Sequence, residues 1–227
     1  MRRLIDASVL LGATTPVWPG DTPFSCGWAC RIASGASINL SAITLSPHVG
    51  THADAPLHVR DGWAATDALP LEVFIGSAIV VDVGDVSAGA EPDGPGALSL
   101  ATLEASARAS GIVLADALRD APRLLLRTGR TIAGGDFPAG WPWVEPDAVR
   151  ALAALGLRLL GVDAPSIDAR ESKTLATHHA LFDAGAFNLE NLDLREVPAG
   201  RYELIAPPLR VEGLDGAPAR AVLVADG

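Results

Sequence analysis

The chain has 227 residues, 49% of them hydrophobic, and its 27 acidic and 17 basic side chains give a formal net charge of −10. This length and composition can bury a substantial core, which predicts one globular domain over residues 1–227. The negative charge and the lack of Lys/Arg runs argue against a nucleic-acid partner. No apolar run approaches the roughly 20 residues of a membrane-spanning helix, so we expect no membrane partner.

The N-terminal segment does not resemble a secretory signal. It begins with two arginines, but Asp6 and Ser8 interrupt the apolar stretch that follows. Cys26 and Cys30 lack a second pair that would complete a zinc tetrahedron, so we expect buried or idle thiols in a reducing cytosol. These features predict a cytoplasmic protein.

Five short apolar runs rich in Val, Ile and Leu are predicted to be strands, because each is bounded by Gly, Pro or Asp. In chain order they are residues 77–84, 123–130, 157–165, 202–211 and 219–227. Two segments between them, 99–111 and 145–156, have apolar residues at helical spacing. Residues 133–143, dense in Gly, Pro and Trp, are predicted to be a loop. The pattern predicts an α/β fold with a mixed sheet and few helices.

Three of the five histidines lie in the stretch SPHVGTHADAPLHV, residues 46–59. In a helix Asp54 would lie about 240° around the axis from His48, and in a straight strand the two would be about 20 Å apart. Metal ligands lie ~2 Å from the ion, so the chain must bend here, and Gly50 is the residue that allows it. His48, His52 and Asp54 would then form a ligand set that zinc, manganese or iron(II) accepts. The alternative is a polar surface loop whose histidines bond to the backbone.

The two remaining histidines lie in the segment TLATHHALFDAGAFNLENLDL. A continuous helix would place His178 and Glu190 about 18 Å apart. Gly185 is predicted to end the helix, so that the chain returns as an extended segment and brings Glu190 back. The spacing leaves open which residues join the site: His178 or His179 as the histidine, and Glu190, Asp183 or Asp193 as the carboxylate.

Other polar candidates have structural explanations. Asp163 and Asp168 follow a predicted strand and could bind a metal, but turn bonding and helix capping explain them as well. Arg127 suits a buried ion pair or a turn rather than a carboxylate clamp, and its role stays unassigned. Trp18, between Val17 and Pro19, is by itself more typical of a packing residue.

The stretch SPHVGTHADAPLH resembles the H-x-G-T-H-x-D-x-P-x-H signature of the cyclase family of metal-dependent hydrolases. The stretches TPVWPGDTPF, LLLRTG, GVDAPSID, ESKTLATHHAL and YELIAPPLRV are similar to the bacterial kynurenine formamidase branch of that family. These matches follow one another in unbroken order from about residue 4 to residue 225.

The resemblance implies a swivelling β/β/α-type fold, a homodimer and two zinc ions per subunit. It implies that His48, His52 and Asp54 hold one zinc, and that Asp54, His178 and Glu190 hold the other. It therefore selects His178 over His179.

The resemblance also implies an activity. His58 would transfer protons and Trp18 would contact the substrate. The reaction would be hydrolysis of N-formyl-L-kynurenine to L-kynurenine and formate, in tryptophan degradation by the kynurenine pathway.

Two other functions compete with this one. A cyclase-family hydrolase that opens a cyclic amide such as isatin would keep His48, His52 and Asp54 but could bind one metal. It would not need the second-site pair of His178 and Glu190. A non-catalytic protein stabilised by a metal would need four closed ligands. The additional histidine, His58, argues against that last reading.

Overall fold

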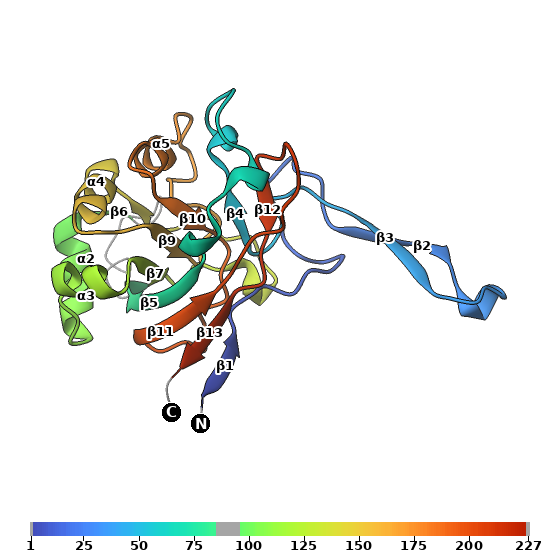
Figure 1. Cartoon of the computed structure of the whole chain (residues 1–227), viewed down its shortest axis with the longest axis horizontal. Coiled ribbons are helices and arrows are strands. Elements are labelled where there is room, and N and C mark those ends of the chain that lie inside the picture. The colour runs from blue at the N-terminus through green and yellow to red at the C-terminus, as the bar shows by residue number, and fades with distance from the viewer. Residues whose placement is uncertain (1, 85–95, 226–227) are drawn as a thin grey trace.

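The computed structural model describes residues 2–84 and 96–225 (Figure 1). Within these residues, seven strands form a mixed sheet in the order β1-β13-β11-β5-β7-β9-β10. Strands β5, β7, β9 and β10 run parallel, whereas β1, β13, β11 and β5 pair antiparallel. The bounds are β1 Arg3–Asp6, β5 Ile75–Asp82, β7 Arg123–Arg127, β9 Leu159–Val162, β10 Phe187–Leu189, β11 Gly200–Ile205 and β13 Val222–Ala225. Five of them correspond to the predicted strands, the last of which extends into residues 226–227, outside the described residues.

Four helices occur in the described part of the chain: α2 Leu100–Ala109, α3 Leu114–Asp120, α4 Pro146–Ala154 and α5 Ala176–Asp183. Helix α2 starts after Ser99, whose hydroxyl accepts a hydrogen bond from the Thr102 amide, and α4 starts on Pro146. Both match predicted helices, and the mixed α/β fold with few helices is confirmed. None of the helices described is both long and apolar enough to cross a bilayer.

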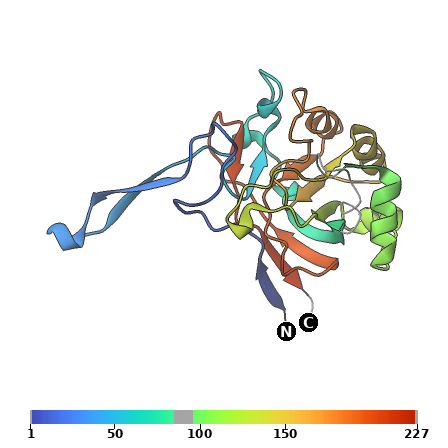
Figure 2. The ribbon, with the colours of Figure 1, turned by 180° about the vertical axis from the view of Figure 1, so that it is seen from behind.

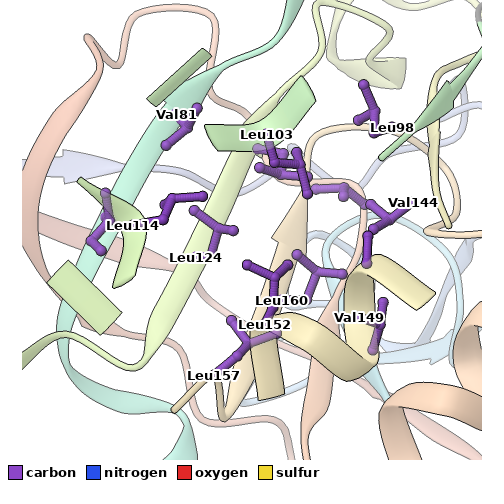
Figure 3. Close-up of a cluster of buried hydrophobic side chains, with 14 of the residues drawn as sticks. Val81, Leu98, Leu103, Leu114, Leu124, Val144, Val149, Leu152, Leu157 and Leu160 are labelled. Atoms are coloured by element: carbon purple, nitrogen blue, oxygen red, sulfur yellow. The ribbon is translucent and has the colours of Figure 1, made fainter. Parts of the chain in front are cut away.

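The two faces of the sheet are buried differently, because neighbouring residues on a strand point to opposite sides. On one face Val81 and Leu124 pack against side chains of all four helices, including Leu103 and Val149 (Figure 3). On the other face Val80 and Leu125 belong to a second cluster that contains Ala53. The second cluster ties the non-helical face to the segment that carries the histidine motif.

Three segments distant in sequence meet on that face. Strand β4 His52–Asp54 pairs antiparallel with β12 Gly216–Pro218, with Asp54 opposite Gly216. His52 also forms an antiparallel bridge with Glu190, the residue after β10. This junction positions the candidate site. The remaining short elements are β6 Ala97–Leu98, β8 Trp143–Val144, and the 3-10 helices Ile32–Ser34, Pro56–His58, Thr66–Ala68, Leu71–Val73 and Ile132–Gly134.

A two-stranded arm projects from the body of the molecule (Figures 1 and 2). It consists of β2 Ser25–Cys30 paired antiparallel with β3 Leu40–Thr44. Its side chains are mostly exposed, including Trp28 at 50% and Ile43 at 61%. Cys26 and Cys30 lie on this arm as free thiols, and neither is buried, because Cys26 is exposed and Cys30 is half-buried. The arm itself was not anticipated from the sequence.

Candidate metal centre

The predicted bend in the histidine motif is present. Gly50 has φ of +70°, in the left-handed region that favours glycine, and β4 begins two residues later. The bend brings His48 Nδ1 to 2.8 Å from Asp54 Oδ1, while His52 Nε2 lies 3.3 Å from the same oxygen. Both imidazoles therefore face one buried carboxylate.

The second half of the site forms as the sequence predicts. Helix α5 ends at Asp183, Gly185 has φ of +70°, and the chain returns along β10 to Glu190. His178 Nε2 lies 3.1 Å from Asp54 Oδ2 and 3.2 Å from Glu190 Oε1. The structure thus brings His178 and Glu190 to the histidine motif.

The alternatives that spacing left open lie elsewhere. His179 is beside Arg60, with its Nδ1 3.4 Å from the guanidinium. Asp183 is exposed and pairs with Arg60, and Asp193 pairs with Arg195. None of these three side chains reaches the carboxylate of Asp54.

The two ring nitrogens are arranged in the same way in His48, His52 and His178. One nitrogen lies close to the carboxylate of Asp54, and the other bonds to an oxygen on the outside. The outer bonds are His52 Nδ1 to Gly50 O at 2.9 Å, His178 Nδ1 to Asp168 Oδ2 at 2.6 Å, and His48 Nε2 to Asp215 Oδ2 at 2.9 Å. Histidines that bind metals in proteins almost always donate their other N–H in this manner.

One buried atom points to a cation. Asp54 Oδ1 is buried and makes no hydrogen bond, although His48 and His52 nitrogens lie close to it. A buried acceptor without a partner is costly unless something else satisfies it. Two groups that share Asp54 have ligand atoms within 4.8 Å of one another: His52, Asp54, Glu190 and His48, Asp54, His58. Imidazole and carboxylate donors at this spacing fit a divalent metal ion.

The electrostatics of the cluster also favour positive charge. Burial alone would lower the pKa of His48, but its contacts with Asp215 and Asp54 raise it to about 10. Burial opposes the charged form of His178 too, yet Asp168, Asp54 and Glu190 raise its pKa well above the usual value. The carboxylates that hold protons on these imidazoles would equally attract a cation, which would displace the protons on binding.

Sequence reasoning missed two residues of the site. Asn188 Nδ2 donates to Asp54 Oδ2 at 2.6 Å, and Asp215 contacts His48 and His58. Neither belongs to a pattern with ligand spacing. The only signal at Asp215 is the Asp-Gly pair, which is typical of a turn.

The other polar candidates are structural. Asp163 accepts hydrogen bonds from the amides of Thr128 and Gly129, at 2.8 and 3.0 Å, which is the turn-bonding role. Arg127 forms an ion pair with Asp82, although both side chains are partly exposed rather than buried. Asp168 accepts bonds from the Thr177 and His178 amides at the start of α5, which is the capping role, and it also holds the His178 ring. These contacts place none of the three at the centre.

A cavity of about 530 Å³ opens beside the cluster. His58 and Trp18 both line it, together with Phe137 and Lys173. Trp18 is 37% exposed and packs edge-to-face on Phe137 and Trp141, with ring centroids 5.7 and 5.6 Å apart. Phe137 and Trp141 belong to the predicted loop 133–143, which therefore forms part of the aromatic wall.

The model of the putative cyclase family matches residues 5–169, a range that contains the whole histidine motif. The chain belongs to this family. The chain is 43% identical to a kynurenine formamidase of Salinibacter ruber, over 97% of this chain and 96% of that protein. It is 39% identical to a kynurenine formamidase of Bordetella avium, over 98% of both.

Solved structures share the fold of this chain. A potential metal-dependent hydrolase with cyclase activity is 27% identical, with a TM-score of 0.76 over 100% of both chains. An isatin hydrolase bound to thioisatinate has a TM-score of 0.81 over 100% of this chain and 93% of that one. Its identity is 24%, so the likeness concerns the fold alone.

Proposed function

We propose that this protein is a kynurenine formamidase, which hydrolyses N-formyl-L-kynurenine to L-kynurenine and formate in tryptophan degradation by the kynurenine pathway. One observation carries the proposal: three imidazoles face two buried carboxylates beside a cavity walled by aromatic rings. The similarity to kynurenine formamidases at 43% and 39% identity over nearly the whole chain supports the substrate.

The cluster is proposed to hold two zinc ions. His48, His52 and Asp54 would hold one ion, and Asp54, His178 and Glu190 would hold the other, so that both ions would share Asp54. When bound, such ions would supply Lewis-acid activation of a water molecule and of the formyl oxygen. The same donors accept manganese and iron(II), so the metal that is loaded also depends on availability.

His58 is proposed to move the protons of the reaction. Water adds to the formyl carbon, the C–N bond breaks, and one proton must travel from the water to the departing aryl nitrogen. His58 lines the cavity, and its Nδ1 lies 3.2 Å from Asp215 Oδ2, which leaves Nε2 to exchange that proton. Imidazole is the side chain suited to both steps near neutral pH.

The cavity also offers groups that suit the rest of the substrate. The aryl ring can pack on Trp18 and Phe137. Lys173 is the only lysine of the sequence, lines the cavity, and makes no ion pair within the residues the structure describes. It can pair with the carboxylate of N-formylkynurenine, whereas isatin has no carboxylate to offer. This favours the formamide over the cyclic amide.

Turnover of three substrates tests the proposal. We expect the zinc-loaded enzyme to hydrolyse N-formyl-L-kynurenine fastest, formanilide, which lacks the carboxylate, more slowly, and isatin least, as measured by absorbance. Removing the metal should abolish all turnover and adding zinc should restore it. Rapid isatin opening without formylkynurenine hydrolysis would instead establish the cyclic-amide function.

Replacing Trp18 with alanine should raise the KM for N-formylkynurenine while the zinc content stays the same. Offset stacking of aromatic rings contributes roughly 0.5 to 1.5 kcal/mol beyond burial, which corresponds to a rise of about two- to twelvefold. Trp18→Phe, which keeps a ring, should stay close to the parent enzyme. If both variants unfold on heating far below the parent, Trp18 is a packing residue and the assignment fails.

We also propose that each subunit is one domain over residues 1–227 and that two subunits form a homodimer. An isolated two-stranded hairpin is marginally stable in water, and the arm exposes apolar side chains such as Trp28 and Ile43. Arg31 is its only charged residue, so it can lie on a second copy of this acidic chain without repulsion between carboxylates. Light scattering should give twice the 23.3 kDa mass of the chain. A monomer at micromolar concentration would contradict the proposal.

A cytoplasmic location is proposed for the enzyme. Cys26 and Cys30 are unpaired thiols on the arm, and reducing compartments keep such thiols unpaired. Cell fractionation should recover the protein with cytosolic markers, and recovery with secreted proteins would oppose this assignment.

A further inference from the structure

Asp215 joins two imidazoles through a single oxygen atom. Its Oδ2 accepts a hydrogen bond from His48 Nε2 at 2.9 Å and another from His58 Nδ1 at 3.2 Å. We propose that Asp215 is a positioning residue, which holds the rings of His48 and His58 and fixes which nitrogen each presents to the cavity. The part concerning proton transfer rests on the proposed function of His58.

The backbone around Asp215 is held firmly against the histidine motif. The Ala55 amide donates to the Asp215 carbonyl at 2.8 Å, and the next residue, Gly216, stands opposite Asp54 in the β12–β4 pair. A Cβ on Gly216 would lie 2.7 Å from Cε1 of His48, so the ring lies directly against the glycine backbone. The carboxylate is therefore presented from a fixed place beside a closely packed imidazole.

The contacts determine where the ring hydrogens lie. An ionised carboxylate only accepts hydrogen bonds, so the N–H groups facing Asp215 are Nε2 of His48 and Nδ1 of His58. That leaves Nδ1 of His48 toward Asp54, at 2.8 Å, and Nε2 of His58 for proton exchange. In catalytic triads, where a base activates a nucleophile, a third group orients the base in the same way.

His48 and His58 depend on this residue more than the other imidazoles do. Their ring centroids are 4.4 Å apart, and Asp215 is the carboxylate that contacts both. His52 and His178 have outer partners of their own, Gly50 O and Asp168. Loss of Asp215 should therefore disturb one proposed metal ligand and the proton carrier together.

The test compares Asp215→Asn with the parent enzyme in two independent measurements. Competition with a chromogenic chelator should show zinc affinity reduced about 10- to 100-fold, the usual effect of losing the hydrogen-bond partner of a ligand. With zinc restored to saturation, kcat for N-formylkynurenine should still fall while KM changes little. Asp215→Glu, which keeps the carboxylate, should retain more of both. Unchanged zinc affinity and unchanged kcat in Asp215→Asn would overturn the proposal.

A double-variant comparison separates positioning from a general structural effect. If Asp215 acts on kcat through His58, then Asp215→Asn should cause little further loss of kcat in a His58→Ala background. Asp168→Asn is the matched control, because Asp168 contacts His178 and not His58; its effect should multiply with that of His58→Ala. If Asp215→Asn lowered kcat by the same factor in the His58→Ala background as in the parent enzyme, the link to His58 would be overturned.

The parent protein provides a measurement that needs no variant to fold and no substrate. Long-range ¹H–¹⁵N NMR of the zinc-loaded enzyme should show His58 carrying its hydrogen on Nδ1. A hydrogen on Nε2 would overturn the proposal. Failure of formylkynurenine turnover alone would overturn the proposed function and leave this result and the zinc affinities to decide the role of Asp215.

Discussion

The variant Asp54→Asn is expected to lose both metal ions and nearly all turnover. The carboxylate of Asp54 lies 2.8 to 3.3 Å from nitrogens of His48, His52 and His178, so it is the one group common to the whole cluster. Asparagine keeps the shape but removes the charge that attracts a cation. Loss of a residue that hydrogen-bonds to a metal ligand reduces metal affinity by roughly 10- to 100-fold. Because Asp54 is itself a proposed ligand, we expect zinc affinity to fall by more than this. Elemental analysis of dialysed protein, alongside turnover, measures both effects.

Two further variants make this result interpretable. Glu190→Gln should mainly empty one of the two sites, because Glu190 approaches His178 and His52 but not His48. Asp183→Asn is the control, since Asp183 is an exposed carboxylate that pairs with Arg60 outside the site. One metal per chain in the parent, unchanged in Glu190→Gln, would refute the bridging role of Asp54.

His58→Ala is expected to keep both metals and the fold but to lose roughly 10² to 10⁴ in turnover, the usual contribution of a general acid–base group. His58 lines the cavity, and its ring hydrogen-bonds to Asp215. Metal content, circular dichroism and kcat on N-formylkynurenine are the measurements. His179→Ala, in which the removed imidazole lies beside Arg60, should change none of them.

The leaving group reveals which proton transfer His58 performs. An arylamine must be protonated as it departs, whereas the leaving group of an activated formate ester needs no acid. The loss in His58→Ala should therefore be smaller for the ester. Equal losses for amide and ester would restrict His58 to activating the water, and loss of metal would make it a ligand.

Much of the candidate site follows from short-range chemistry in the sequence. The bend at Gly50 and the helix end at Gly185 were both predicted, because a glycine at positive φ is the simplest way to turn the chain between polar residues of this spacing. The strands at the centre of the sheet were also predicted, because a strand that is buried on both faces has a continuous run of apolar residues. Such features depend on neighbours within a few residues.

The features that were missed depend on distant segments. Asp215 reaches His58 across 157 positions through the pairing of β12 with β4, which no local pattern encodes. Asn188 reaches Asp54 across 134 positions. The arm was not predicted, because its apolar side chains are exposed, whereas apolar residues are expected to form a core.

The pairing of β4 with β12 also has a consequence for the order of events during synthesis. The histidine motif emerges from the ribosome about 160 residues before Gly216, its partner in that pair. Contacts between such distant positions form late, because the closure of a long loop opposes them. The nascent chain therefore contains His48 and His58 before Asp215, the carboxylate proposed to orient them, has been made. The complete arrangement around His48 and His58 therefore forms only after residues 216–218 have been made and have paired with β4.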